Sequence, residues 1–280
     1  MDASAFEFED QFGEYRRCLT IPKPITAAAD GFKAFEDTVA VWTLQQCIKA
    51  LQVPGRRKSS EFPGEGEEDQ GPWGSCQGWM QANAVWRAAY AGGNTSLTKR
   101  SGPYQYSLVN NGRDNGSALI DGYYAARKYG FCSYTSCGRD MVWRHQTQQF
   151  DAEARLFIPA DPLLIYTWEG LRTALCGPFI CGIAVQVGRT FERLSSTGLL
   201  GLDDGPGNHA VCADDARIGP DGDIEGKLIM DWGLRHGING CGWFNRQHVK
   251  QTMGMHQFCA YPVGQWGTGQ WGTGQRENDA

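Results

Sequence analysis

The sequence predicts an α+β fold, with helices in the first part of the chain and an antiparallel sheet in the second. Residues 76–91 carry apolar side chains at helical spacing and end at two glycines, and a second helical pattern over 118–129 ends at Gly130. Residues 179–187 are then rich in β-branched and aromatic side chains, which favour strands. Turn residues at 220–223 separate two later strand patterns, which indicates antiparallel pairing.

The remaining elements follow from local patterns. Residues 1–29 have little periodicity and predict an extended arm, whereas Asp30 is a candidate cap for a helix running to about Gln52. Residues 101–117 are rich in turn signals and predict a loop. Further along we expect a short helix over 168–175 and strands over 208–213, 227–232, 243–249 and 256–263.

Composition limits the possible partners. The chain has 280 residues and a net charge of -5, with a pI near 5.6, which argues against nucleic acid or an anionic membrane as the main partner. No apolar run reaches the roughly 18 residues of a membrane-spanning helix. The acidic N-terminus has no secretory signal pattern, so we expect a cytoplasmic or otherwise non-secreted protein. The ten cysteines are scattered, which predicts reduced thiols and no zinc site.

Cys76 lies at the start of the predicted helix over 76–91, a position that favours a reactive thiol. Exposed backbone N–H groups and the helix dipole favour the thiolate there, which is the reactive form of the thiol. Gln70 precedes it and supplies an amide donor that a turn can bring back towards the sulfur. A cysteine in this position is also commonly just a small buried apolar residue, so the rest of the sequence has to decide.

Several motifs occur in a consistent order. Gly74-Ser75-Cys76 is followed by His209 about 130 residues later, and then by Asp231. This arrangement resembles the papain-like cysteine protease family. Further similarities lie in Asp69-Gln70-Gly71, in residues 101–130, in residues 168–185, in Asn208-His209-Ala210-Val211 and in residues 228–233. The resemblance covers about residues 60–263, and it implies a helical left half with the nucleophile helix and an antiparallel, β-barrel-like right half.

The resemblance implies a cysteine endopeptidase that hydrolyses polypeptide substrates through an acyl-enzyme and needs no metal or organic cofactor. It assigns Cys76 as nucleophile, His209 as its acid–base partner and Gln70 as the oxyanion donor. It also implies a substrate contact at the backbone of Gly116 and a shielding role beside the substrate for Trp232. Peptide specificity and oligomeric state do not follow from the sequence.

The third catalytic residue is open between two alternatives. The family has Asn-Ser-Trp-Gly at this point, whereas this chain has Met230-Asp231-Trp232-Gly233. A regular strand places Asp231 on the face opposite Met230 and Trp232. A deletion or bulge instead aims the Asp231 carboxylate at His209, and this is the alternative we favour. If Met230 takes the position, a Cys–His dyad remains.

The same resemblance divides the chain into an N-terminal extension over 1–58, which is a possible propeptide or docking segment, a catalytic domain over 59–263 and a Gly/Trp/Gln-rich tail over 264–280. Trp73 stands where the family has a disulfide cysteine, and Gln77 replaces the tryptophan that normally follows the nucleophile. These departures keep a second function open, that of a catalytically degraded binding or structural protein with this fold. Acyl transfer to an amine is a third, weaker alternative.

Overall fold

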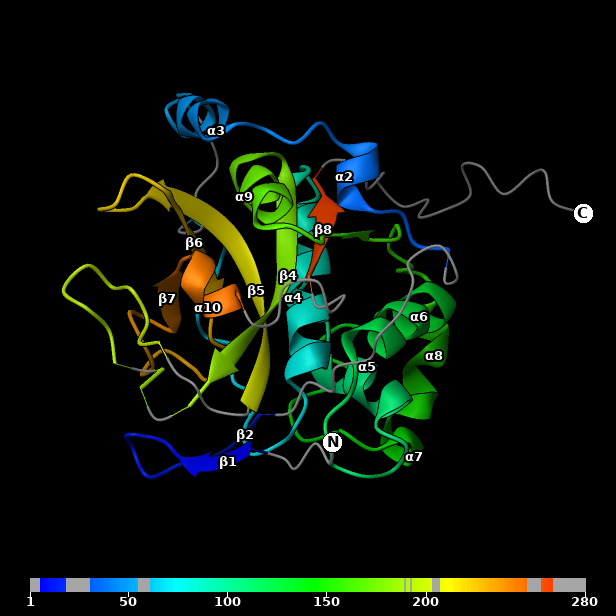
Figure 1. Ribbon diagram of the computed structural model, residues 1–280. Helices are drawn as coiled ribbons and strands as arrows, with labels where there is room; N and C mark the ends of the chain where they lie inside the picture. The colour runs from blue at the N-terminus through cyan, green and yellow to red at the C-terminus, as the bar shows by residue number, and fades with distance from the viewer. Residues whose placement is uncertain are drawn as a thin grey trace, which may run out of the picture.

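The computed structural model describes residues 6–18, 31–54, 61–188, 190–191, 193–202, 207–250 and 258–263. A helical half and a sheet half lie side by side, with the long helix α4 between them (Figure 1). The helical half contains the elements α4 (Cys76–Ala91), α5 (Gly102–Val109), α6 (Leu119–Tyr129), α7 (Arg144–Thr147), the 3-10 turn η2 (Gln148–Phe150) and α8 (Asp151–Ala154).

The sheet half is one six-stranded antiparallel sheet in the order β3-β8-β4-β5-β6-β7. Its strands are β3 (Leu163–Leu164), β4 (Phe179–Val187), β5 (Gly207–Ile218), β6 (Ile224–Ile229), β7 (Cys241–Phe244) and β8 (Phe258–Pro262). Two helices accompany this half, α9 (Trp168–Cys176) and α10 (Arg246–Val249). The expected α+β class is therefore the observed one.

The sheet separates two hydrophobic cores because strand side chains alternate between its faces. On β4, Ile183 and Val185 face the core that contains α9, whereas Ile180 and Ala184 face the core that contains α4. This explains why β4 reads as a nearly continuous apolar run: both of its faces are buried. The strand that carries the candidate histidine pairs directly with it, so that strand is held in the centre of the sheet.

Helix α4 is buried along almost its whole length, and not only on one face. Its close packing against α5 depends on two glycines. A Cβ atom on Gly78 would lie 2.2 Å from the carbonyl oxygen of Gly102, which no side chain can occupy without moving a backbone. This contact fixes the first turns of α4, and hence Cys76, against the helical half.

The N-terminal region differs from the expected extended arm and single helix. Residues 6–18 contain an antiparallel hairpin of β1 (Phe6–Glu9) and β2 (Tyr15–Cys18). Two short helices, α2 (Phe35–Thr38) and α3 (Leu44–Leu51), replace the helix predicted over 30–52, whose proposed cap at Asp30 lies outside the described residues. The break occurs because Thr43 forms a capping box with Gln46 and starts a new helix.

Three further predictions about elements were wrong. The region 101–117 contains α5, which Ser101 caps by accepting a hydrogen bond from the backbone N–H of Tyr104. The strand predicted over 243–249 is β7 followed by α10, because Asn245 begins a helix with a capping box. The strand predicted over 227–232 ends at Ile229.

Phe35 of α2 and Cys47 of α3 pack into the core that contains α9, so part of the predicted extension contributes to the same core as the sheet. The predicted tail over 264–280 lies outside the described residues. The structure describes the side chains of nine cysteines, all of which are buried and none of which forms a disulfide. No helix in that part is long and apolar enough to cross a membrane.

Candidate active site

Cys76 is the first residue of α4 and is fully buried. The loop before it is held from the helical half, since the backbone N–H of Gly74 donates to Asp114 Oδ1 at 2.9 Å. Ser75 makes no side-chain cap hydrogen bond to α4. The sulfur therefore sits at the positive end of the helix dipole, as the sequence predicts, in a loop anchored by a carboxylate.

His209 lies on β5, which packs against α4. Its Nε2 is 2.8 Å from the carbonyl oxygen of Met230, and its ring stacks on the indole of Trp232 with centroids 4.6 Å apart and an angle of 20° between the planes. A carbonyl oxygen only accepts hydrogen bonds, so Nε2 carries the proton. The neutral imidazole therefore has its basic nitrogen at Nδ1, and Trp232, which is 1% exposed, shields one face of the ring.

Asp231 does not make the contact that we favoured from the sequence. Its Oδ1 accepts a 2.8 Å hydrogen bond from Asn83 Nδ2 on α4, and its Oδ2 has no hydrogen-bond partner in the described part of the chain. The backbone turns at this residue, with φ of +57°, after β6 has ended. This left-handed turn directs the Met230 carbonyl to His209 and the carboxyl group into the protein.

The carboxyl group of Asp231 is fully buried. Burial raises its pKa well above the ordinary value, and the nearby Glu68 raises it further, whereas Arg87 and the hydrogen bond from Asn83 act in the opposite direction. Burial at this position therefore favours the neutral acid over the carboxylate.

Gln70 is fully buried, and its side-chain amide points at two backbone carbonyls. Nε2 donates to the carbonyl of Trp73 at 2.9 Å and to that of Arg17, on β2, at 3.2 Å. Its own backbone N–H donates to the carbonyl of Asp231 at 2.9 Å, which ties the Gln70 loop to the segment after β6. The β1–β2 hairpin thus brings the Arg17 carbonyl into hydrogen-bond contact with the Gln70 amide, which the sequence predicts to stabilise an oxyanion.

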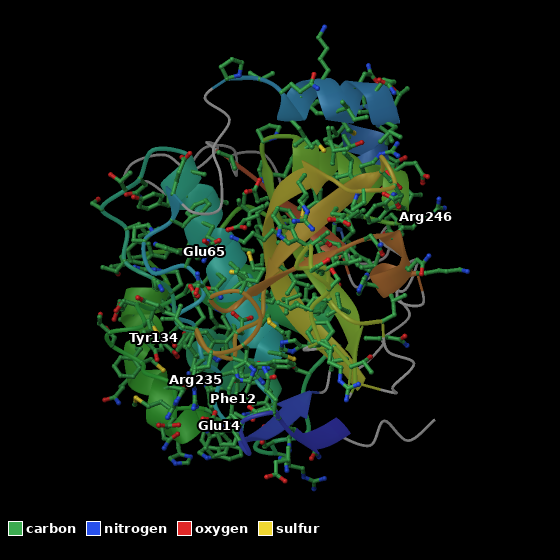
Figure 2. The ribbon with its side chains drawn as sticks, turned by 90° about the vertical axis from the view of Figure 1, so that its left-hand side faces the viewer. Phe12, Glu14, Glu65, Tyr134, Arg235 and Arg246 are labelled. Carbon is green, nitrogen blue, oxygen red and sulfur yellow. The ribbon has the colours of Figure 1, made fainter. Side chains whose placement is uncertain are left out.

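The hairpin is fixed at its turn as well. His236 Nε2 lies 3.3 Å from Asp10 Oδ2, both groups being buried, and the ring of Phe12 meets the His236 ring edge-on at 5.2 Å. Arg235 also forms an ion pair with Glu14. Figure 2 shows Phe12, Glu14 and Arg235 together beside the hairpin, and Figure 1 shows the hairpin next to the lower end of β5.

Gly116 lies next to the loop that precedes Cys76. A Cβ on Gly74 would come 3.2 Å from the backbone nitrogen of Gly116, which itself donates to the hydroxyl of Tyr106 at 3.1 Å. That hydroxyl donates in turn to Asp114 Oδ1 at 2.7 Å. Burial, then Asp114 and, to a smaller extent, Cys76 raise the pKa of Tyr106, which places its phenol within electrostatic range of the thiol.

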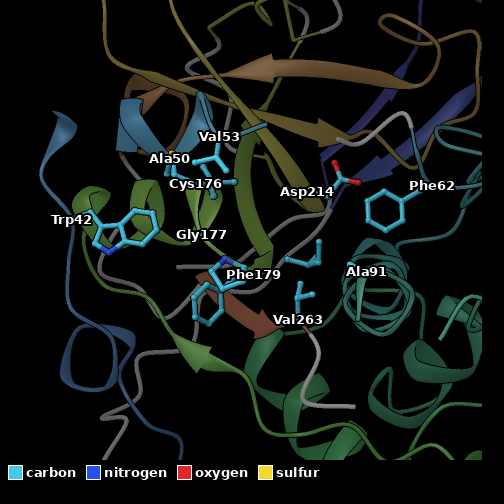
Figure 3. Close-up of a pocket in the computed structure, with 13 residues that line it drawn as sticks. Trp42, Ala50, Val53, Phe62, Ala91, Cys176, Gly177, Phe179, Asp214 and Val263 are labelled. Carbon is cyan, nitrogen blue, oxygen red and sulfur yellow. The ribbon is translucent and has the colours of Figure 1, made fainter. Parts of the chain in front are cut away.

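Two other features contain none of the residues predicted for the site. An apolar cavity of about 370 Å³ is lined by residues that include Trp42, Phe179 and Val263, and no residue predicted for the site lines it (Figure 3). Asp10, Glu14 and His236 bring three possible metal-ligand atoms within 4.8 Å of one another, but the contact of Asp10 with His236 and the ion pair of Glu14 with Arg235 account for the arrangement.

Sequence reasoning missed three contributors to the site. Asn83 was hidden because its partner, Asp231, comes from another half of the fold. Asp114 lies in a segment that reads as a turn, and nothing in its spacing signals a role beside Cys76. Arg17 belongs to the arm that was expected to be merely extended.

Comparison with known proteins agrees with the architecture. No protein-family model matches the sequence, and no curated protein matches it significantly. Solved structures do match. Xylellain, a cysteine protease from Xylella fastidiosa, has a TM-score of 0.62 and 18% identity over 87% of this chain and 95% of its own. Procathepsin L 3 from the larval midgut of Tenebrio molitor has a TM-score of 0.56 and 16% identity over 82% of this chain and 79% of its own.

Procathepsin B S9 from Trypanosoma congolense has a TM-score of 0.58 and 15% identity, over 88% of this chain and 92% of its own. At such identities the likeness concerns the fold. The chain therefore has the papain-like cysteine protease fold, in a divergent sequence, and this part of the sequence prediction is confirmed.

Proposed function

We propose that this chain is a cysteine peptidase that hydrolyses peptide bonds with Cys76 as nucleophile and His209 as its acid–base partner. The observation that carries the proposal is the orientation of His209. Its Nε2 is held by the Met230 carbonyl and its ring by Trp232, on a strand packed against the helix that begins with Cys76. An imidazole held in one tautomer suits the activation of a thiol.

The carbonyl of Met230 takes the role that we had expected of the Asp231 carboxylate. Because it keeps the proton on Nε2, Nδ1 is the nitrogen that exchanges a proton with Cys76. The catalytic pair is then a Cys–His dyad oriented by a main-chain group. Asp231 acts through the backbone, since its left-handed conformation aims the carbonyl.

The proposed reaction has two stages. The Cys76 thiolate adds to the carbonyl carbon of the scissile bond, and the carbonyl oxygen becomes an oxyanion that the Gln70 amide stabilises. The His209 imidazolium gives its Nδ1 proton to the departing amine as the C–N bond breaks, leaving a thioester. Water then adds to the thioester while His209 takes its proton, and the new acid leaves as the C–S bond breaks.

Labelling with an epoxide or vinyl-sulfone probe tests the proposal. We expect one modified residue, Cys76, in the intact chain, and a large loss of labelling in His209→Ala. Cys181, Cys212 and Cys259 are internal controls, because burial raises the pKa of Cys181 and Cys212 well above the ordinary value and that of Cys259 to about 12.

Turnover of a fluorogenic peptide by the same preparation completes the test. Labelling with turnover supports a peptidase, and turnover that gives an amide with an added amine identifies acyl transfer instead. Absence of both labelling and turnover contradicts the proposal and favours a binding protein with a degraded site.

A further inference from the structure

The residue seated at the candidate active site is an arginine of the chain itself. The carbonyl oxygen of Arg17 accepts from Gln70 Nε2 at 3.2 Å, and Arg17 Nη1 donates to Asp114 Oδ2 at 2.7 Å. The same Nη1 also donates to the backbone carbonyl of Asp114 at 2.9 Å. One residue therefore contacts the proposed oxyanion donor with its carbonyl and a carboxylate with its side chain.

Asp114 is held in place by contacts that do not involve a guanidinium. Its Oδ1 accepts from the backbone N–H of Gly74 and from the hydroxyl of Tyr106, while Oδ2 is the oxygen that meets Arg17. The side chain of Asp114 is 11% exposed, so its charge is only weakly screened by water. Gly74 belongs to the nucleophile loop, which sets this carboxylate directly beside the residues that precede Cys76.

We propose that Asp114 determines specificity by binding an arginine side chain of the substrate, namely the arginine whose carbonyl is attacked. The inference rests on the proposed function, because it takes the Gln70 amide as the place of the reacting carbonyl. A residue with its carbonyl there directs its side chain as Arg17 does, towards Asp114. The substrate class is then a polypeptide cleaved after arginine.

The geometry favours a guanidinium over other side chains. Arg17 contacts a carboxylate oxygen and a backbone carbonyl, both of which only accept hydrogen bonds, so the ligand has to be a donor. A citrulline has nearly the same shape but no charge, and it loses the charge-assisted part of this contact. We therefore expect a preference for arginine over citrulline of about 10- to 100-fold in kcat/KM.

The first experiment compares two fluorogenic peptides that differ only in arginine or citrulline before the cleaved bond. The variant is Asp114→Asn in the full chain, which keeps Oδ1 for Gly74 and Tyr106 and replaces only the oxygen that meets the guanidinium. We expect the preference to fall to about 3-fold or less. Asp161→Asn removes the exposed carboxylate paired with Arg127. This variant is the matched control and should keep the preference for arginine over citrulline.

A binding measurement separates this inference from the proposed function. Full-length Cys76→Ala, with Arg17→Ala added to weaken the internal competitor, is titrated with the arginine and citrulline peptide acids. Tighter binding of the arginine peptide that is lost in Asp114→Asn supports the inference even if no peptide is hydrolysed. Hydrolysis without arginine preference overturns the inference and leaves the peptidase. Failure of both peptides to bind also overturns it.

Discussion

Replacing Asp231 with asparagine tests how His209 is oriented. Asparagine keeps an oxygen to accept from Asn83 and tolerates the left-handed backbone, where φ is +57°. A carboxylate that oriented the imidazole would be indispensable, and its loss to an amide would lower kcat by about 10⁴-fold. Because the Met230 carbonyl holds Nε2 instead, we expect kcat to change by less than about 10-fold.

The same variant changes the pH dependence of stability. Burial raises the pKa of Asp231 in the folded state, so the folded chain holds a proton that the unfolded chain releases above its ordinary pKa of 3.8. This carboxyl group therefore makes the free energy of unfolding fall as pH rises from that value towards the raised pKa, by up to about 1.4 kcal/mol per pH unit. Asparagine does not titrate, so the variant lacks this pH dependence of the free energy of unfolding.

Urea unfolding at about pH 5 and about pH 7 measures the effect. The free energy of unfolding of Asp231→Asn, relative to the parent chain, should rise between these values by up to about 2–3 kcal/mol. Asp221→Asn, at an exposed turn position, serves as the control and should show no such rise. The reasoning would be refuted if the free energy of unfolding changed equally with pH in Asp231→Asn and the parent chain. A kcat reduced by about 10³-fold or more in the variant would also refute it.

Three more changes have defined outcomes. Arg87→Met removes a fully buried guanidinium that lies 2.6 Å from the buried Asp214 carboxylate, and should lower the free energy of unfolding by about 3–5 kcal/mol in urea. Gly78→Ala forces a methyl group towards the Gly102 carbonyl and should cost about 1–3 kcal/mol, seen as a lower Tm. Gln70→Ala should reduce kcat by about 10²–10³-fold in steady-state peptide assays.

The two stability variants have matched comparisons, and the Gln70 variant has a contradicting outcome. Arg139→Met breaks an exposed ion pair with Asp69 and should cost about 1 kcal/mol or less, so an equal loss in both arginine variants would contradict the role given to burial. Gly112→Ala meets no atom within 4 Å, so its cost reports only the positive φ of that turn. An unchanged kcat in Gln70→Ala would remove Gln70 from the oxyanion site.

The long helix and its neighbours were predictable because local signals agreed with the fold. The bounds of α4 match the predicted 76–91, and Gly130 ends α6 with φ of +74°, as a C-terminal glycine commonly does. The helix α5 was missed because its cap and its Pro103 were outweighed by the turn signals just after it. Local patterns identified elements well where no neighbouring signal competed.

The site could be predicted only in part, for a physical reason. The roles proposed for Cys76, Gln70 and His209 follow from short motifs that can be read along the chain. The orientation of His209 depends on one backbone angle at Asp231, which decides between a carbonyl and a carboxylate as its partner. No residue pattern fixed that angle in advance.

The hairpin that contacts Gln70 belongs to the same molecule, and this has a kinetic consequence. A tethered ligand acts at an effective concentration that is commonly millimolar and does not fall on dilution. Under the proposed function, a substrate peptide competes with Arg17 for the Gln70 amide, and its apparent affinity is reduced by the fraction of molecules in which Arg17 occupies that amide. Cleavage of the chain after Cys18 would end this tethering, and the hairpin would then compete only at its concentration in bulk solution.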